Sequence, residues 1–265
     1  MSLKEKYGTT ALIAGASEGM GAAFATYLAS EGMNLVLIAR SAERLQQFAD
    51  SLKNTYKTDV LCIVCDLGST DAMMHVEEQL NGMEPDLLVY NAASSHIGPF
   101  LKNSLDNHLL STRVNMITPL QMVHHFGNKM TAKGKGAVIL INSLAGFQGS
   151  GYLSVYAASK AFGRILAESL WYEWKNCGVD IIACCAGATA TPNFRRTNPE
   201  KSSFFAPAIQ TPEEVVDECF RMLGKKPSYI TGRGNRIASY IMHRILPRRV
   251  AVNIMGDNTR KMYRL

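Results

Sequence analysis

Residues 9–21 of the chain have the sequence TTALIAGASEGMG, and this stretch decides the fold. Thr9–Ala14 is a short apolar run of the length of a buried strand. Glycines follow at positions 15, 19 and 21, and apolar residues at helical spacing continue to Ser30, with Gly32 placed to end a helix. We therefore predict a strand, a tight glycine turn and a helix, which together begin a βαβ unit.

Strand-sized apolar runs and helix-sized segments alternate along the rest of the chain. The predicted strands cover residues 35–39, 60–65, 87–90, 137–142, 179–185 and 228–231, and the predicted helices cover 41–56, 71–80, 155–174 and 212–223, with a helical pair in 101–132. The strands are apolar throughout, which is typical of a parallel sheet with helices on both faces. The sequence thus predicts an α/β fold, with one doubly wound domain in residues 1–232 and a parallel sheet of about seven strands.

The composition excludes several classes of protein. With 47% hydrophobic and 19% charged residues, the chain of 265 residues is neither disordered nor fibrous. Its longest apolar runs have the length of a strand, so no membrane span is expected, and the first ten residues lack the apolar stretch of a secretory signal. Six scattered cysteines do not form a disulfide framework, and a cytoplasmic location is therefore expected.

The net charge of +6 is concentrated in the last part of the sequence. Residues 233–265 hold eight Lys or Arg and one acidic residue, Asp257, so the remainder is almost neutral. A nucleic-acid-binding protein more often carries its basic residues on the fold itself, so no nucleic-acid partner is expected. An apolar stripe accompanies the charges, formed by Ile237, Tyr240, Ile241 and Ile245. This segment is predicted to be a basic amphipathic helical extension of the domain.

Three roles remain open for this extension. It can pack on the fold or on another subunit, it can lie on an anionic membrane surface and make the protein peripheral to a membrane, or it can dock an acidic acyl-carrier protein. The charge pattern alone does not separate these roles.

The glycine turn predicts a site for a dinucleotide. Glycine lets the backbone turn sharply and approach a pyrophosphate, and the helix that follows offers free N–H groups and a partial positive charge. Arg40 follows the second strand, where enzymes that bind NAD usually place a carboxylate, and a guanidinium there suits a 2′-phosphate. The sequence therefore favours NADP(H) over NAD(H), although Glu18 within the turn counts against a phosphate.

A second group of residues indicates proton transfer. Ser143 ends the fifth predicted strand, and Tyr156 and Lys160 follow at a spacing of four, which places both on one face of a helix. A tyrosine hydroxyl ordinarily has a pKa of about 10. Because a nearby ammonium favours the phenolate, and the ribose and nicotinamide cation of a bound cofactor add to this effect, the pKa of Tyr156 is expected to be lowered, so that the hydroxyl exchanges a proton at neutral pH.

Together these residues resemble the motifs of the short-chain dehydrogenase/reductase family. The match runs from about Thr9 to Gly232, and its motifs are the Gly15–Gly21 turn, Asp66, Asn91-Ala92-Ala93, Asn115, Ser143, Tyr156-x-x-x-Lys160 and Gly187-x-x-x-Thr191. The departures from the family pattern lie at backbone-shaping positions, namely Ala14, Tyr90, Ala93 and Ala186. The resemblance implies a Rossmann-fold dinucleotide-binding catalytic domain in an oxidoreductase that interconverts a ketone and a secondary alcohol with NAD(P).

The resemblance also implies roles for the site residues. Tyr156 is expected to be the general acid/base, and Ser143 to polarise the substrate carbonyl. Lys160 is expected to bond the nicotinamide ribose, and Asn115 to position a water for proton relay. The expected cofactor contacts are Gly15, Ser17, Glu18, Gly19, Met20, Gly21, Arg40, Asp66, Leu67, Asn91, Ala92, Tyr156, Lys160, Gly187, Thr189 and Thr191.

The substrate is expected to be a small hydrophobic carbonyl compound or alcohol, such as a 3-oxoacyl chain or a steroid. This expectation depends on aromatic residues in 190–208, among them Phe194, Phe204 and Phe205, in a stretch with three prolines that is expected to be a mobile lid. Family members commonly form homodimers or homotetramers, and the same is expected here. The alternative hypothesis is a dinucleotide-binding regulatory or membrane-peripheral protein without turnover.

Other suggestive residues are given structural roles. Cys62 and Cys65 lie at positions i and i+3 of a predicted strand, where they point to opposite faces, and they are expected to be buried. His124 and His125 have no third ligand at a useful spacing, so no metal site is expected. His96 follows the fourth strand near the expected site, where a contact with the substrate remains open.

Overall fold

The computed structural model describes residues 2–197 and 209–265. At its centre is a sheet of seven parallel strands in the order β3-β2-β1-β4-β5-β6-β7. The strands are β1 (Thr10–Ala14), β2 (Asn34–Ala39), β3 (Val60–Val64), β4 (Leu87–Tyr90), β5 (Gly136–Ser143), β6 (Val179–Ala186) and β7 (Ser228–Ile230). The predicted α/β fold with a doubly wound parallel sheet is confirmed.

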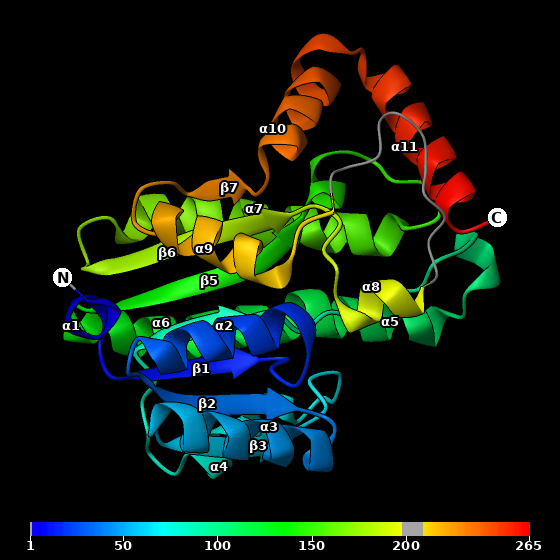
Figure 1. Ribbon diagram of the computed structural model, residues 1–265. Coiled ribbons are helices and arrows are strands. Elements are labelled where there is room, and N and C mark those ends of the chain that lie inside the picture. The colour runs from blue at the N-terminus through cyan, green and yellow to red at the C-terminus, as the bar shows by residue number, and fades with distance from the viewer. Residues whose placement is uncertain (1, 198–208) are drawn as a thin grey trace.

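Helices cover both faces of the sheet, because each strand is apolar on both sides. In β1, Ile13 belongs to one buried cluster and Leu12 to the other. The first face is covered by α2 (Gly19–Ser30), α3 (Ala42–Tyr56) and α9 (Pro212–Met222), with the short α1 (Leu3–Tyr7) at its edge. The second face is covered by α4 (Ala72–Leu80), α6 (Thr118–Lys133) and α7 (Ser154–Trp174). Figure 1 shows the resulting three layers.

The chain changes its direction across the sheet between β1 and β4. Strands β2 and β3 lie on one side of β1, whereas β4 to β7 lie on the other. At such a switch point the loops that leave the two central strands diverge, which opens a crevice at the carboxyl ends. The N–H groups of Asn91 and Ala92 donate to the carbonyl of Ala14 at 3.0 and 2.8 Å, so the loop after β4 is joined to the start of the glycine turn.

The helical pair predicted for residues 101–132 is a nearly continuous helical run. A 3₁₀ turn (Phe100–Lys102) precedes α5 (Leu105–Thr112), and a π-helical turn (Arg113–Ile117) joins α5 to α6. A π turn inserts one extra residue into a helix and frequently marks a functional site. Here it carries Asn115, whose side chain is buried behind the crevice.

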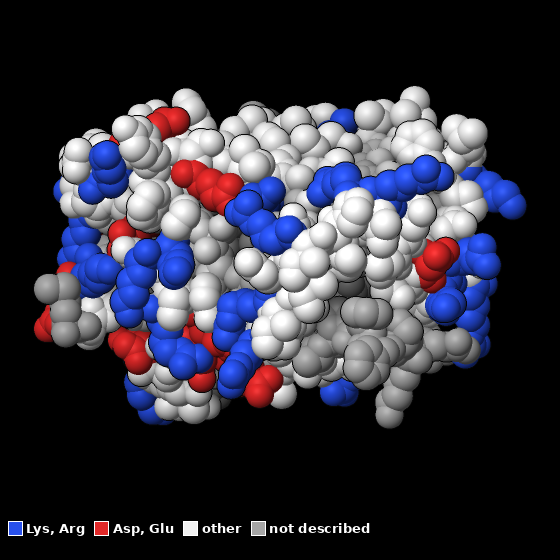
Figure 2. Space-filling view, turned by 90° about the horizontal axis from the view of Figure 1, so that it is seen from above, with Lys and Arg blue, Asp and Glu red and all other residues white. Residues whose placement is uncertain are grey.

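The last part of the chain, residues 233–265, is called the tail below. It begins with α10 (Arg233–Tyr240), continues through a π-helical turn (Ile241–Ile245) and ends with α11 (Arg248–Met262). α10 rises from the edge of the sheet, and α11 returns on the side toward which β1 and β2 point (Figure 1). The face seen from above carries more Lys and Arg than Asp and Glu (Figure 2). Among the described residues, no helix is both long and apolar enough to cross a bilayer.

Candidate active site

A cavity of about 680 Å³ lies at the carboxyl ends of the strands and reaches from the glycine turn to the tail. The predicted site residues that line it are Gly15, Ser17, Glu18, Gly19, Met20, Arg40, Asp66, Leu67, Asn91, Ala92, Ser143, Tyr156, Lys160, Gly187, Thr189 and Thr191. Gly21 and Asn115 are not part of its wall and are buried behind it. The fold thus gathers residues from the whole length of the chain around one cavity.

The glycine turn is packed so tightly that side chains are excluded. Gly15 has a φ of +82°, and a Cβ there would lie 2.8 Å from the backbone of Ala92. A Cβ at Gly21 would lie 1.9 Å from the carbonyl oxygen of Gly15, which already accepts a hydrogen bond from Asn91 Nδ2 at 2.9 Å. The backbone is therefore free to approach a ligand, and no side chain caps the N-terminus of α2. This arrangement suits a pyrophosphate.

Glu18 is the N-cap residue of α2, but its carboxylate points to arginines instead of the helix. It accepts a hydrogen bond from Arg44 of α3 at 3.0 Å. Arg196 forms a two-point ion pair with it from α8 (Pro192–Arg196), with one contact at 3.2 Å. Arg40 lines the cavity nearby, is exposed, and has no ion pair with the described residues. The negative charge predicted to oppose a phosphate is therefore already paired with two cations.

The loops after β3 and β6 complete the cofactor side of the cavity. Asp66 accepts a hydrogen bond from the Gly68 N–H at 2.9 Å and keeps its other carboxylate oxygen available, beside the buried Leu67. Thr191 caps α8 by accepting from the Phe194 N–H at 3.1 Å, and a Cβ at Gly19 would lie 3.1 Å from the Thr191 side chain. Thr191 therefore lies against the glycine turn.

Ser143, Tyr156 and Lys160 line the same cavity as the glycine turn. Ser143 ends β5, and the two other residues project from the first turns of α7. Lys160 is buried, and its Nζ donates to the carbonyl of Ile141 at 2.8 Å. The same Nζ lies 5.6 Å from the centroid of the Tyr156 ring. The predicted i, i+4 pairing on one helix face is present.

The predicted lowering of the Tyr156 pKa is wrong for the protein's own groups. Burial raises the pKa of the Tyr156 hydroxyl, a hydrogen bond with Ser143 lowers it, and the nearby Tyr263 raises it. The ammonium of Lys160 is directed to the Ile141 carbonyl, so it does not offset the burial. Burial in turn lowers the pKa of Lys160 to about 8. The site therefore pairs a neutral phenol with a lysine that can lose its proton near neutral pH.

Asn115 connects three elements behind the catalytic wall. Its Oδ1 accepts from the Ser94 N–H at 2.8 Å, and its Nδ2 donates to the Ser94 carbonyl at 2.7 Å and to Ser159 Oγ at 3.1 Å. The carboxamide thus joins the loop after β4 to α7.

His96 lies outside the main cavity, in a small recess beside Tyr156, and its Nδ1 lies 3.1 Å from Ser111 Oγ.

The tail supplies a part of the cavity wall that was not predicted from the sequence. Its lining residues are Ala238, Ser239, Met242, His243, Ile254, Met255, Asn258, Thr259, Met262 and Tyr263. α11 packs on the loop after Ser143, where a Cβ at Gly149 would lie 3.6 Å from Val252 and a Cβ at Gly151 would lie 3.3 Å from Gly256. Of the predicted stripe, Ile237, Tyr240 and Ile245 are exposed, so the apolar stripe faces outward.

The remaining predictions have mixed outcomes. Cys62 and Cys65 are free thiols that pack on opposite faces of the sheet, as predicted, but only Cys65 is buried and Cys62 is partly exposed. His125 pairs with Glu77 at 2.9 Å, and no group of three or more metal-ligating side chains occurs in residues 2–197 and 209–265. Phe194 lines the cavity, whereas most of the predicted lid, with Phe204 and Phe205, lies outside the described residues.

Comparison with known proteins agrees with this geometry. The family model for short chain dehydrogenase matches residues 9–202. A 7β-hydroxysteroid dehydrogenase of Mediterraneibacter gnavus is 34% identical over 238 residues, which are 89% of this chain and 90% of the relative.

Two solved structures are also similar to this chain. The structure described as "Structural and biochemical insights into 7beta-hydroxysteroid dehydrogenase stereoselectivity" has a TM-score of 0.89 at 30% identity and covers 96% of this chain and 99% of its own. A short-chain dehydrogenase from Sphingobium yanoikuyae in complex with NADPH has a TM-score of 0.74 at 26% identity, covering 84% and 87%. This chain therefore belongs to the short-chain dehydrogenase/reductase family and is an oxidoreductase that acts on the CH–OH/C=O pair.

Proposed function

We propose that the protein is an NADP(H)-dependent hydroxysteroid dehydrogenase, which interconverts a ketone and a secondary alcohol on a steroid ring. The observation that carries this proposal is the tail, which lines the cavity beside Tyr156. The match to the hydroxysteroid dehydrogenase structure covers 96% of this chain, whereas the tail is about 12% of it, so the similarity includes most of the tail. The match to the short-chain dehydrogenase solved in complex with NADPH covers 84% of this chain.

The protein's residues fit a dinucleotide with a 2′-phosphate. The glycine turn leaves no room for side chains, and the uncapped N-terminus of α2 supplies free N–H groups for a pyrophosphate. Arg40 is exposed at the end of β2 and offers a fork of donors to a phosphate. Because Glu18 is paired with Arg44 and Arg196, its charge is screened from this position. These observations support NADP(H) over NAD(H).

In the proposed reaction, bound NADP(H) supplies or accepts the hydride. The Tyr156 hydroxyl gives its proton to the carbonyl oxygen during reduction and takes it back during oxidation. Ser143, whose hydroxyl acts on Tyr156 to lower its pKa, orients the same oxygen. Lys160, with its pKa lowered to about 8, has its Nζ 5.6 Å from the centroid of the Tyr156 ring, and its contact with Ile141 fixes its position. Asn115 holds α7 and the loop after β4 together through its hydrogen bonds to Ser159 and Ser94.

A hydrophobic ring substrate suits the part of the cavity that the tail shares with Tyr156. Large apolar side chains contribute to its lining, namely Leu144, Leu153, Phe194, Met242, Ile254, Met255 and Met262. A steroid offers a large apolar surface, and its burial contributes about 25 cal/mol per Å² to binding. Methionines on the tail can adapt to the edge of a fused ring system. The site therefore favours a bulky ketone over a small one.

The proposal extends to the setting of the enzyme. We propose a homodimer or homotetramer in the cytoplasm, where the six free thiols would remain reduced. A contact of the tail with an anionic membrane is a second candidate role, favoured by exposed Ile237, Tyr240 and Ile245 among basic residues. Flotation with anionic liposomes tests this role by comparing the wild type with the triple variant Ile237→Ser/Tyr240→Ser/Ile245→Ser. Equal flotation of the two proteins would remove it.

Oxidation of NADPH with a panel of oxosteroids, a 3-oxoacyl thioester and cyclohexanone tests the main proposal. We expect turnover with at least one oxosteroid, a preference for NADPH over NADH, and a loss in kcat of at least about 100-fold in Tyr156→Phe. Binding of NADPH to Tyr156→Phe, followed by fluorescence, controls for folding. Equal rates in Tyr156→Phe and the wild type would refute the mechanism, and turnover of the thioester alone would refute the substrate class.

A further inference from the structure

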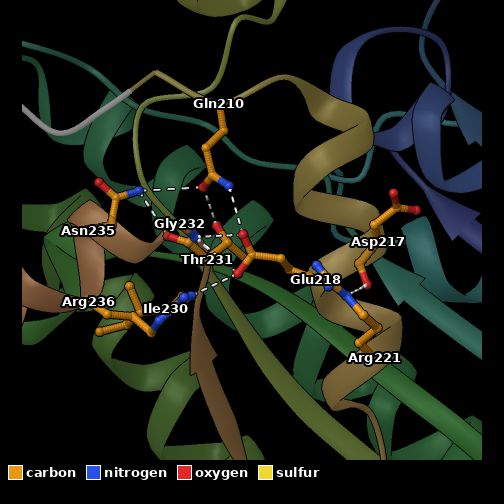
Figure 3. Close-up of polar contacts among 9 residues, drawn as sticks. All are labelled: Gln210, Asp217, Glu218, Arg221, Ile230, Thr231, Gly232, Asn235 and Arg236. Carbon is orange, nitrogen blue, oxygen red and sulfur yellow. Dashed lines mark hydrogen bonds and ion pairs between the residues drawn. The ribbon is translucent and has the colours of Figure 1, made fainter.

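A buried polar cluster lies outside the cavity, where α9, the end of β7 and the start of the tail meet. It consists of Gln210, Glu218, Thr231, Gly232, Asn235 and Arg236 (Figure 3). Thr231 and Asn235 are fully buried, and Gln210 is nearly so. None of these six residues lines the cavity. Buried polar groups are costly unless they are paired, so this much pairing away from the site indicates a role in holding segments together.

Glu218 is the centre of the cluster. Its carboxylate accepts hydrogen bonds from Gln210 Nε2 at 3.2 Å, from the Gly232 N–H at 3.0 Å and from Arg236 Nη1 at 2.8 Å. Its side chain is 16% exposed, so these contacts are poorly screened by solvent. One carboxylate on α9 therefore fixes the side chain of Gln210, the N-cap residue Gly232 of α10, and Arg236 in the first turn of the tail.

Gln210 joins this centre to the cavity wall. Its backbone pairs with the loop after β6, donating to the Ala188 carbonyl at 3.0 Å and accepting from the Ala190 N–H at 2.9 Å. Its side-chain oxygen accepts from Thr231 Oγ1 at 2.8 Å. Ala188 lines the cavity, so a single residue touches the loop that forms the wall and the strand that leads into the tail.

Asn235 completes the connection from the tail. Its Nδ2 donates to the Thr231 carbonyl at 2.9 Å, and a Cβ at Gly187 would lie 2.4 Å from the same atom. The first turn of α10 is thus seated directly on the loop after β6. Ala238 and Ser239, one turn further along α10, line the cavity. The position of this turn therefore sets where the tail's part of the wall begins.

We propose that Gln210 and Glu218 are positioning residues, which hold the tail at a fixed distance from the Gly187–Thr191 loop and thereby keep the tail's part of the cavity wall in place. This proposal rests on the proposed function, because it assigns the wall to a bulky substrate. Gln210 and Glu218 act through α10 and touch neither the substrate nor the cofactor. Weakening their contact should reduce binding of a bulky ketone and leave the chemistry at Tyr156 intact.

Exchanging the two side chains provides a specific test. Gln210→Glu places two carboxylates opposite each other at the 3.2 Å contact, and their repulsion should release the tail. The double variant Gln210→Glu/Glu218→Gln restores one donor and one acceptor with their roles exchanged. Asp217→Asn is the matched control, because Asp217 is a neighbouring acidic residue on α9 whose carboxylate points away from the cluster in Figure 3.

Two measurements are made on each variant. Hydrogen exchange followed by mass spectrometry reports the order of residues 233–265 without any need for activity. In Gln210→Glu we expect about ten-fold faster exchange there and about ten-fold higher KM for the oxosteroid, with kcat and the kcat/KM for cyclohexanone within about two-fold of the wild type. The double variant should return both quantities toward wild-type values, and Asp217→Asn should change neither.

The outcomes separate the two proposals. Unchanged exchange in Gln210→Glu, or a folded double variant that stays as perturbed as the single one, would overturn the positioning role. Faster exchange with recovery in the double variant supports that role, even if no steroid is turned over and the proposed substrate class fails. If Gln210→Glu does not fold, Arg236→Met removes a half-exposed donor to Glu218 and carries the same expectation.

Discussion

Replacing Lys160 with methionine is expected to change how stability depends on pH, in a way that can be worked out from the structure. Burial lowers the pKa of Lys160 from its usual 10.5 to about 8, whereas unfolding restores the usual value. Near pH 7 both states carry the ammonium, and the folded state must keep it out of water. A pKa lowered this far corresponds to about 3 kcal/mol of destabilisation below pH 8.

The loss of a hydrogen bond offsets part of the stability that Lys160→Met gains by removing this buried charge. The ammonium donates to the Ile141 carbonyl at 2.8 Å, and such a bond from a charged donor contributes about 1.5–3 kcal/mol. Lys160→Met loses this bond together with the buried charge. The variant should therefore be as stable as the wild type at pH 7, or more stable by up to about 2 kcal/mol. Its turnover should nevertheless be severely reduced.

The pH dependence gives the sharper test. Between about pH 8 and pH 10.5 the unfolded lysine still binds a proton that the folded lysine has lost, so the stability of the wild type rises with pH. Lys160→Met lacks this contribution. The wild type should therefore gain about 2.5 kcal/mol relative to the variant between pH 7 and pH 10. Tyrosines and cysteines are common to both proteins, so their titration largely cancels in the difference.

Urea unfolding of both proteins at pH 7, 8, 9 and 10 measures this difference. Lys102→Met is the control, because Lys102 is exposed and its loss should leave the curve parallel to that of the wild type. Parallel curves for the wild type and Lys160→Met would refute the reasoning, since the ammonium would then not be desolvated in the folded protein.

Two further changes test the cofactor side of the cavity. Glu18→Gln removes the carboxylate that pairs with Arg44 and Arg196, so both cations become available and the ratio of KM for NADH to KM for NADPH should rise by about three-fold or more. An unchanged ratio would show that the released cations do not reach a 2′-phosphate. Gly21→Ala places a Cβ 1.9 Å from the Gly15 carbonyl oxygen, which the backbone cannot absorb. Calorimetry should show a lower unfolding temperature and no binding of NADPH, whereas wild-type affinity would show that the turn tolerates a side chain.

The parts of the fold that the sequence predicts well are those where one physical cause dominates. The strands can be predicted because they are apolar on both faces. The bounds of β4 agree with the prediction, and the bounds of the other strands differ from it by a residue or two. The glycine turn and the Tyr156–Lys160 pair are local, because backbone conformation and helix periodicity place them. The π-helical turn at Arg113–Ile117 leaves no such local pattern and was not predicted.

The substrate side of the cavity was harder to predict because the face of the tail that lines the cavity is not the most apolar face of the tail. On α10 and the turn that follows it, the cavity is lined by Ala238, Ser239 and Met242, whereas Ile237 and Tyr240 face outward. Hydrophobic periodicity therefore selects the wrong face. The pairing of Glu18 with Arg196 joins residues 178 positions apart, and no local spacing reports it.

The parallel bridge between Thr189 and Gln210 also has a consequence for how such enzymes diverge. It joins Thr189, which lines the cavity, to Gln210, which contacts the start of the tail. The entropic cost of lengthening a closed loop is small, about 0.6 kcal/mol for each doubling. Insertions and deletions between the bridged residues can therefore accumulate without disturbing the anchoring. The bridge therefore keeps the loop after β6 and the segment before α9 at one spacing, whatever the length of the sequence between them.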